Sequence, residues 1–194
     1  MAMSTVRAVV QPIAIAIALA FAVRASSIGI YSIPSPSMQP TLQVGDTILV
    51  TPYLKGQTPT HGDVVVFRSP SVRDEMVVKR VIATPGDLIE SRDGAVTIGG
   101  HALAEPYVLT RGLSGAIAPQ VIPAGCYFVL GDNRGNSYDS RLWGVIRSDA
   151  IVGRARLVLW STHRRLNAPH AHASPITPAD PFRERGIRLF RVVR

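Results

Sequence analysis

Two serines separated by one proline stand in the stretch 33–42, IPSPSMQPTL, and either hydroxyl could serve as a nucleophile. A serine attacks a carbonyl only when a nearby base takes its proton. The three prolines of this stretch exclude an α-helix and stiffen the backbone. We therefore expect Ser35 and Ser37 to lie in an extended, rigid loop. A hinge between two parts of the chain is the alternative interpretation.

Histidine is the usual base for such a serine, but none of the histidines stands in a strand-like apolar setting. A Ser-His-Asp triad is therefore not indicated, although the sequence does not exclude one. The histidines near the C-terminus also have no carboxylate or thiol at metal-ligand spacing, so no metal and no cofactor is expected. The five histidines are His61, His101, His163, His170 and His172.

Lysine is the other candidate base, and the chain has only Lys55 and Lys79. Lys55 precedes a glycine in a polar loop, which is typical of a solvated side chain. Lys79 lies within the predicted strand 76–82, where strand alternation places it on the same face as Val77 and Val81. Desolvation on an apolar face disfavours the ammonium and lowers the pKa of a lysine. The alternative is a lysine on an edge strand that reaches water.

A polar loop, Gly131–Gly144, follows the apolar strand predicted at 126–130. The loop is rich in Asp, Asn, Ser and Arg, which indicates a structured hydrogen-bond network. Within it, Asp139 could pair with Arg141. Asp132 could pair with an arginine elsewhere, such as Arg80.

The elements that must position these residues are mostly β-strands. Short segments rich in Val and Ile alternate with Gly, Pro, Asp and Asn, and no long stretch between them has helical spacing. The fold class is therefore mostly β: an antiparallel, barrel-like catalytic domain over residues 32–160. Ser91–Gly94 indicates a hairpin turn, and 91–122 a small inserted β subdomain. The predicted strands are 46–51, 63–67, 76–82, 87–90, 95–98, 126–130 and 151–160.

The N-terminal 31 residues are expected to contain one transmembrane helix. No charge interrupts the segment between Arg7 and Arg24, and extension to Tyr31 gives enough length to span a bilayer. A cleaved signal peptide and a buried core helix are the alternatives. The charges that flank the segment do not set its orientation.

The tail, residues 161–194, is basic and rich in proline and arginine, and we expect it to pack on or extend the catalytic domain. The whole chain has a formal net charge of +8, which favours an anionic partner. Basic residues do not interleave with aromatic ones, so we expect membrane lipid as the partner and no nucleic acid.

Taken together, these stretches resemble the bacterial type I signal peptidases (leader peptidases), membrane-bound serine proteases with a Ser/Lys dyad. The resemblance runs from about Ser32 to Trp160. It implies removal of signal peptides from secretory preproteins after a small-x-small site, typically Ala-x-Ala. The matching segments, in order, are 34–42, 45–46, 62–67, 78–87 and 131–144, and the ending 186–191 is also similar.

The resemblance also implies a role for each site residue. Ser37 would be the nucleophile and Lys79 the general base. Ser35 would add its hydroxyl to the oxyanion hole beside the backbone N–H of Ser37, and Ser137 would orient Lys79. The ion pairs Asp132–Arg80 and Asp139–Arg141 would support the loop, and Tyr31, Ile33, Pro34 and Val78 would line the substrate pocket.

The same resemblance implies a single-pass protein of the bacterial cytoplasmic membrane. Its N-terminus would lie in the cytoplasm and its catalytic domain on the outer side. Gly135 stands where the family usually has an aspartate, but we expect activity to survive this departure. Two alternatives are a dedicated processing peptidase of conjugation systems and an inactive, membrane-anchored module that binds preproteins.

Overall fold

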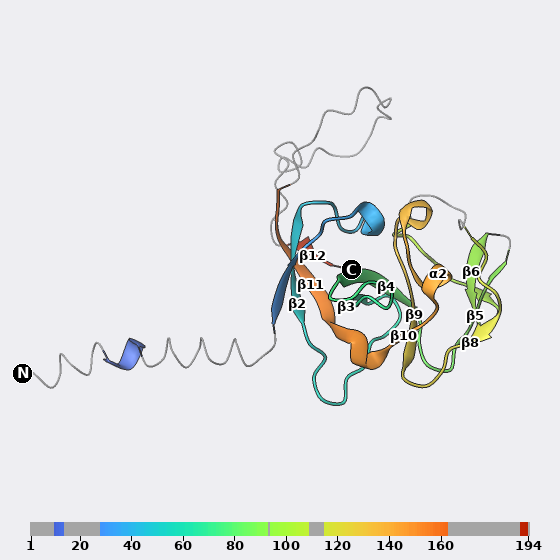
Figure 1. The fold of residues 1–194 in the computed structure, drawn as a ribbon, viewed down its shortest axis with the longest axis horizontal. Helices are drawn as coiled ribbons and strands as arrows, with labels where there is room; N and C mark the ends of the chain where they lie inside the picture. The colour runs from blue at the N-terminus through green and yellow to red at the C-terminus, as the bar shows by residue number, and fades with distance from the viewer. Residues whose placement is uncertain (1–9, 14–27, 93, 109–114, 163–190, 194) are drawn as a thin grey trace, which may run out of the picture.

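The regular structure of the chain is almost entirely β, in two antiparallel sheets (Figure 1). The computed structural model describes residues 10–13, 28–92, 94–108, 115–162 and 191–193. Every strand pairing in the described part is antiparallel. The predicted mostly-β, antiparallel class is therefore confirmed.

The larger sheet carries the stretches expected to form the site. Its two ends, β1 and β10, do not pair with each other within the described residues, so the sheet is open and not a closed barrel. In order across the sheet, its strands are β1 (Gly29–Ser32), β2 (Asp46–Thr51), β11 (Ile151–Ser161), β3 (Val64–Arg68), β4 (Met76–Ala83), β9 (Cys126–Leu130) and β10 (Ile146–Arg147), with β12 (Arg191–Val192) paired to β11.

The smaller sheet lies in the part of the chain between β4 and β9. The predicted hairpin is present, because Arg92 pairs with Ala95 across its turn. The sheet begins at Leu88, ahead of the start expected at residue 91. Its strands, in order, are β7 (His101–Ala102), β6 (Ala95–Ile98), β5 (Leu88–Arg92) and β8 (Gln120–Val121).

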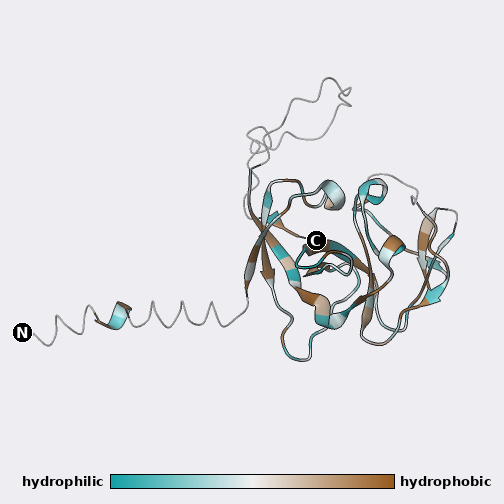
Figure 2. Cartoon of the chain, viewed as in Figure 1, coloured by the Kyte–Doolittle hydropathy of each residue, from teal (hydrophilic) through white to brown (hydrophobic). Residues whose placement is uncertain are grey.

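Apolar residues of the strands pack into three clusters, and β4 contributes to each of them. Val78 packs against the first cluster, Ile82 belongs to the second and Val81 to the third. The brown, apolar residues in Figure 2 follow these strands. Since β4 pairs with β3 on one side and β9 on the other, Lys79 stands on an inner strand and not on an edge.

Short helical turns interrupt the connections, where the sequence had indicated no helix. They lie next to the stretches that carry the candidate site residues. They are η1 (Pro36–Met38), η2 (Arg134–Asn136), α2 (Ser140–Trp143) and η3 (Ser148–Ala150).

The expected membrane anchor falls mainly on residues 14–27, which lie outside the described residues. None of the described residues forms a helix with the length and apolar character needed to cross a bilayer. Residues 163–190 of the tail also lie outside them, with His163, His170 and His172. Beyond this gap, β12 adds to β11, and Val193 packs into the first apolar cluster.

Candidate active site

Ser37 lies in the 3-10 turn η1, and not in the extended backbone that the sequence predicted. Pro36 occupies the start of the turn, where proline is tolerated because its missing N–H would have no helical partner. Ser35, just before it, is extended, with φ −124° and ψ 154°. The prolines therefore exclude an α-helix but allow one tight turn, and this turn directs Ser37 inward.

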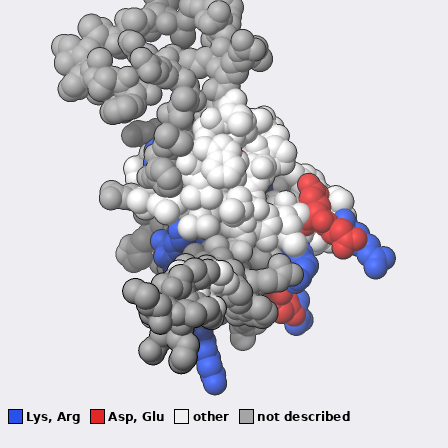
Figure 3. Space-filling model, turned by 90° about the vertical axis from the view of Figure 1, so that its left-hand side faces the viewer, with Lys and Arg blue, Asp and Glu red and all other residues white. Residues whose placement is uncertain are grey.

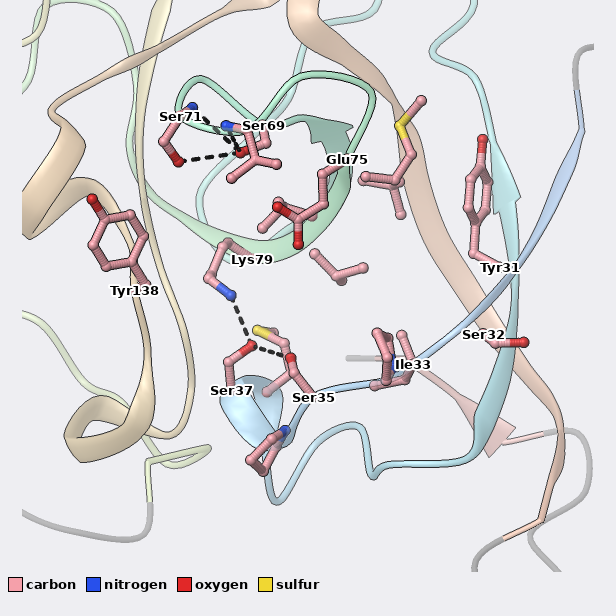
Figure 4. A pocket seen from close by; sticks show the side chains of 18 of the residues that line it. Tyr31, Ser32, Ile33, Ser35, Ser37, Ser69, Ser71, Glu75, Lys79 and Tyr138 are labelled. Atoms are coloured by element: carbon pink, nitrogen blue, oxygen red, sulfur yellow. Dashed lines mark hydrogen bonds between the residues drawn. The ribbon is translucent and has the colours of Figure 1, made fainter.

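Lys79 meets Ser37 inside the protein. Lys79 Nζ donates a hydrogen bond of 2.7 Å to Ser37 Oγ (Figure 4). Lys79 is only 4% exposed and Ser37 8% exposed. The alternative of a lysine that reaches water is therefore wrong, and the serine is in direct contact with a candidate base.

The surroundings of Lys79 favour its neutral form. Burial lowers the pKa of Lys79 to about 8 from its ordinary 10.5. The carboxylates of Asp139, Asp132 and Glu75 oppose this shift, and Arg141 adds to it. Since desolvation is the largest effect, a substantial fraction of the amine is neutral in mildly alkaline solution.

Ser35 lies beside the nucleophile, with its Oγ 3.2 Å from Ser37 Oγ. Both hydroxyls face the cleft shown in Figure 4. The N–H of Ser37 belongs to the first turn of η1, where backbone donors have no partner within the helix. The hydroxyl of Ser35 and the N–H of Ser37 thus belong to one short stretch of chain.

The polar loop holds the backbone of Ser37. Asn133 donates its N–H to Ser37 O at 3.0 Å and its side-chain amide to Pro36 O at 3.2 Å. Gly131 is packed so closely that a Cβ built on it would lie 2.5 Å from Ser37 O. The loop therefore fixes η1 in place, and Gly131 is required for the close approach.

Arg80 and Asp132 form a buried ion pair, as expected from the sequence. Arg80 Nε and Nη2 donate to the two carboxylate oxygens at 2.8 and 2.7 Å. Arg80 also donates to Gly62 O at 2.7 Å, and Thr41 donates its hydroxyl to Asp132. The pair thus joins β4, the loop and the segment that follows Ser37.

Asp139 and Arg141 form the second expected ion pair. Arg141 Nε and Nη2 donate to Asp139 at 2.7 and 2.8 Å, and Asp139 also accepts the N–H of Gly131 at 3.1 Å. As the N-cap of α2, the same carboxylate accepts the N–H of Arg141. This pair closes the loop on itself next to Lys79.

Ser137 is near the dyad, but its expected hydrogen bond to Lys79 is not formed. Its Oγ is buried and has no hydrogen-bond partner in the described part of the chain. A Cβ on Gly131 would lie 2.2 Å from this Oγ and 2.5 Å from Ser37 O, so Ser137 lies beside the nucleophile. The hydroxyl is therefore available to a group that enters or turns within the site.

The smaller sheet is linked to the polar loop through contacts that the sequence did not reveal. Glu105, on the segment after β7, forms a two-pronged ion pair with the buried Arg134, whose Nε donates to Gly131 O at 3.1 Å. The ring of Tyr107 lies 4.0 Å from the guanidinium carbon of Arg80. Glu105 also accepts the hydroxyl of Tyr107 at 3.0 Å. The inserted segment thus supports the first residues of the loop, directly through Arg134 and indirectly through Arg80, the partner of Asp132.

A cleft of about 390 Å³ opens over Ser37 and Lys79. All four predicted pocket residues line it. The turn between β3 and β4, the start of β4 and side chains of the polar loop form the opposite wall, which the sequence did not indicate. The predicted residues are Tyr31, Ile33, Pro34 and Val78, and the additional ones include Ser69, Glu75, Met76, Tyr138 and Trp143.

Comparisons with known proteins identify the family of this chain. The family model described as "Signal peptidase, peptidase S26" matches residues 6–160. A signal peptidase I of Leptolyngbya laminosa is 35% identical over 164 residues, covering 80% of this chain and 80% of its own. A signal peptidase I of Bacillus amyloliquefaciens is 34% identical over 165 residues, covering 79% of this chain and 84% of its own.

A third relative, a probable signal peptidase I of Synechocystis, is 34% identical over 155 residues, covering 77% of this chain and 71% of its own. The matched segment includes both members of the dyad, the polar loop and all strands from β1 to β10. The chain therefore belongs to the signal peptidase family, peptidase S26, whose members are serine endopeptidases.

Proposed function

We propose that this protein removes N-terminal signal peptides from secretory preproteins, with Ser37 as nucleophile and neutral Lys79 as general base. The hydrogen bond of 2.7 Å between the two side chains carries the proposal. It places a base with a lowered pKa within proton-transfer distance of a hydroxyl, at the floor of an open cleft.

The reaction follows from this geometry. Neutral Lys79 takes the proton of Ser37 Oγ as the oxygen attacks the scissile carbonyl, and the carbonyl π electrons move to its oxygen. The hydroxyl of Ser35 and the N–H of Ser37 stabilise that oxyanion. When the C–N bond breaks, the ammonium of Lys79 gives its proton to the leaving amine. Water then attacks the acyl-enzyme, with Lys79 again taking and returning a proton.

Ser137 is proposed to orient Lys79 when it is protonated. An ammonium has three donors, one of which points to Ser37 in the structure. The buried hydroxyl of Ser137 lacks a partner among the described residues and can accept a second donor. A buried hydroxyl without a hydrogen bond destabilises the fold. A hydrogen bond to protonated Lys79 would explain why Ser137 has such a hydroxyl next to the dyad.

The cleft supports a preference for small side chains on the amino side of the cleaved bond. Ile33, Pro34 and Val78 line the same cleft as the dyad, so a substrate residue beside Ser37 meets apolar side chains. We propose that the substrate is extended beside β4 and the segment before Ser37, with small residues such as alanine at the first and third positions before the bond.

The proposed location is the bacterial cytoplasmic membrane, with one anchor over residues 1–31 and the catalytic domain outside. Support comes from the uncharged run between Arg7 and Arg24. Figure 3 shows a face of the molecule on which most described side chains are uncharged. Ile30, Trp160 and Val192 are exposed, which is suited to contact with lipid.

The two alternative functions make different predictions. An inactive preprotein-binding module has no use for a lysine buried against a serine, so the dyad argues against it. A dedicated processing peptidase of conjugation systems would have the same dyad, but it would cleave one substrate and reject others of the small-x-small type.

The test uses the purified full-length protein in detergent and a set of unrelated preproteins with Ala-x-Ala sites. We expect the wild type to cleave several of them, and Ser37→Ala and Lys79→Ala to cleave none. Asp149→Asn, which alters an exposed side chain outside the motif segments and outside the cleft lining, is the matched control. Cleavage by either dyad variant would refute the mechanism, and cleavage of a single preprotein would favour the dedicated peptidase.

A further inference from the structure

We propose that Glu75 forms a subsite for a positively charged substrate residue about four positions before the cleaved bond. This inference rests on the proposed function, because it assigns a specificity determinant to the same cleft. It concerns a residue in the turn between β3 and β4, outside every motif of the site.

Glu75 supplies a negative charge that the cleft does not neutralise. Glu75 and Lys79 are the charged residues among those that line the cleft. Lys79 must be neutral to act as a base, so in the active form the carboxylate of Glu75 is the remaining charge. Its side chain makes no hydrogen bond or ion pair with any residue that the structure describes.

The orientation of Glu75 is that of a ligand group. In Figure 4 its carboxylate points into the cleft, from the turn that leads into β4, the strand that carries Lys79. Its neighbour Asp74, by contrast, has a side chain that is 94% exposed and does not line the cleft. Of these two adjacent carboxylates, only that of Glu75 faces the cleft in which a substrate would lie.

The position along the substrate follows from the strand geometry. Glu75 immediately precedes β4 and stands four residues before Lys79. An extended substrate rises about 3.3 Å per residue, so four of its residues span about 13 Å. Val78, which lines the proposed pocket for the amino side of the substrate, precedes Lys79 in the same direction. The amino side of an extended substrate therefore runs toward Glu75 and reaches it after about four residues.

The expected strength of this preference is modest. Glu75 is exposed at the cleft wall, where an ion pair is screened by solvent and salt. A cationic residue at the matching position should raise kcat/KM about two- to five-fold at low ionic strength. The gain should shrink in concentrated salt, as a surface ion pair does.

The test compares pairs of synthetic substrates that differ in charge alone. Each has an Ala-x-Ala site, and either arginine or its neutral isostere citrulline stands at the fourth, fifth or sixth position before the cleaved bond. A second series carries the pair at the same distances after the bond. The ratio of kcat/KM for arginine over citrulline is measured for the wild type, Glu75→Gln, Glu75→Lys and the matched control Asp74→Asn.

For the wild type and Asp74→Asn, we expect the ratio of kcat/KM for arginine over citrulline to exceed one when the residue stands before the cleaved bond. It should be close to one when the residue stands after the bond. The ratio should be close to one for Glu75→Gln and below one for Glu75→Lys. The proposal would be overturned by a ratio of one in the wild type or by a ratio above one that persists in Glu75→Gln. It would also be overturned if Asp74→Asn lost the preference for arginine as fully as Glu75→Gln. Failure of the wild type to cleave the citrulline peptides would instead count against the proposed function.

Discussion

Lys79 and Ser37 are 42 residues apart in the chain, and a hydrogen bond of 2.7 Å joins their side chains. The contact is buried, so the lysine amine loses its hydration. It interacts instead with the hydroxyl of Ser37 and with the charges of neighbouring side chains. Such a group is costly to charge, and this cost makes it a usable base. The predictions below follow from this contact and from the residues that hold it.

The first prediction concerns the pH dependence of cleavage. Protonated Lys79 has no lone pair to accept the serine proton, so kcat/KM should rise with pH as the amine loses its proton. Because burial lowers the pKa of Lys79 to about 8, the midpoint should lie near pH 8. The measurement is kcat/KM for a neutral peptide between pH 6 and 10. A midpoint near the ordinary lysine value, or near that of histidine, would contradict Lys79 as the base.

The second prediction is that Lys79→Met abolishes activity but stabilises the fold at neutral pH. A pKa lowered from 10.5 to about 8 means that the folded protein holds this proton less well than the unfolded chain. At pH 7 this costs about 3 kcal/mol. Loss of the hydrogen bond to Ser37 offsets about 1 kcal/mol. The free energy of unfolding should therefore rise by about 2 kcal/mol in the variant.

The sign of this effect can be checked by titration. Between pH 8 and 10.5 the unfolded state binds more protons than the folded state, so the stability of the wild type should rise with pH in this window. The advantage of Lys79→Met should shrink over the same range, as measured by urea unfolding. If Lys79→Met were less stable than the wild type at pH 7, burial of the protonated lysine would not be destabilising.

The third prediction concerns the ion pair of Arg80 and Asp132. Their side chains are 2% and 0% exposed, so Asp132→Ala leaves a buried guanidinium without its counter-charge. Removal of one partner of a buried pair costs about 3–5 kcal/mol. Urea unfolding should show this loss, and activity should fall because the loop that holds Ser37 is released.

The matched control is Asp149→Asn, which removes the carboxylate from the exposed pair with Arg147. No measurable change in the free energy of unfolding is expected, because solvent screens such a pair. Equal effects of the two substitutions would mean that the buried pair contributes no more than an exposed one.

The fourth prediction concerns Gly131. A Cβ at this position would lie 2.5 Å from Ser37 O and 2.2 Å from Ser137 Oγ, so the loop or η1 must move. A displacement of about 1 Å at a nucleophile can lower a rate about 100-fold, and Gly131→Ala should lower kcat to this extent. The measurement is single-turnover cleavage of a peptide.

Gly100→Ala is the control for this experiment. Gly100 has φ +82° and nothing within 4 Å of a built Cβ, so its substitution strains a turn without crowding the site. It should cost about 1 kcal/mol of stability and leave kcat unchanged. If both variants lost activity equally, the close approach at Gly131 would not be the cause.

Much of the scaffold was predictable because it depends on local pattern. Alternating Val and Ile between turn residues gave strands whose observed bounds are close to those expected, as for β4, expected over 76–82 and observed over Met76–Ala83. The same alternation placed Lys79 on an apolar face but left open whether its side chain reaches water, which the inner position of β4 excludes. The polar loop was recognisable from its composition, and both expected ion pairs are present.

Other features depend on contacts between distant segments, which no local pattern reveals. Glu105 and Tyr107 lie in an irregular segment, and they matter only because the chain folds back against Arg134 and Arg80. The turn at η1 was missed because proline is compatible with both an extended chain and the start of a helical turn. The orientation of Ser137 depends on a hydroxyl rotor that sequence does not specify.

The contacts of Glu105 and Tyr107 have a consequence for the order in which the site is assembled. Ser37 and Lys79 are both synthesised before the smaller sheet, but Asn133, which holds the backbone of Ser37, follows it. The loop is in turn tied to the inserted segment through Arg134. A nascent chain that has reached only β4 therefore carries both reactive groups without the frame that aligns them. The frame that aligns Ser37 with Lys79 is complete only once the chain beyond β9 has been synthesised.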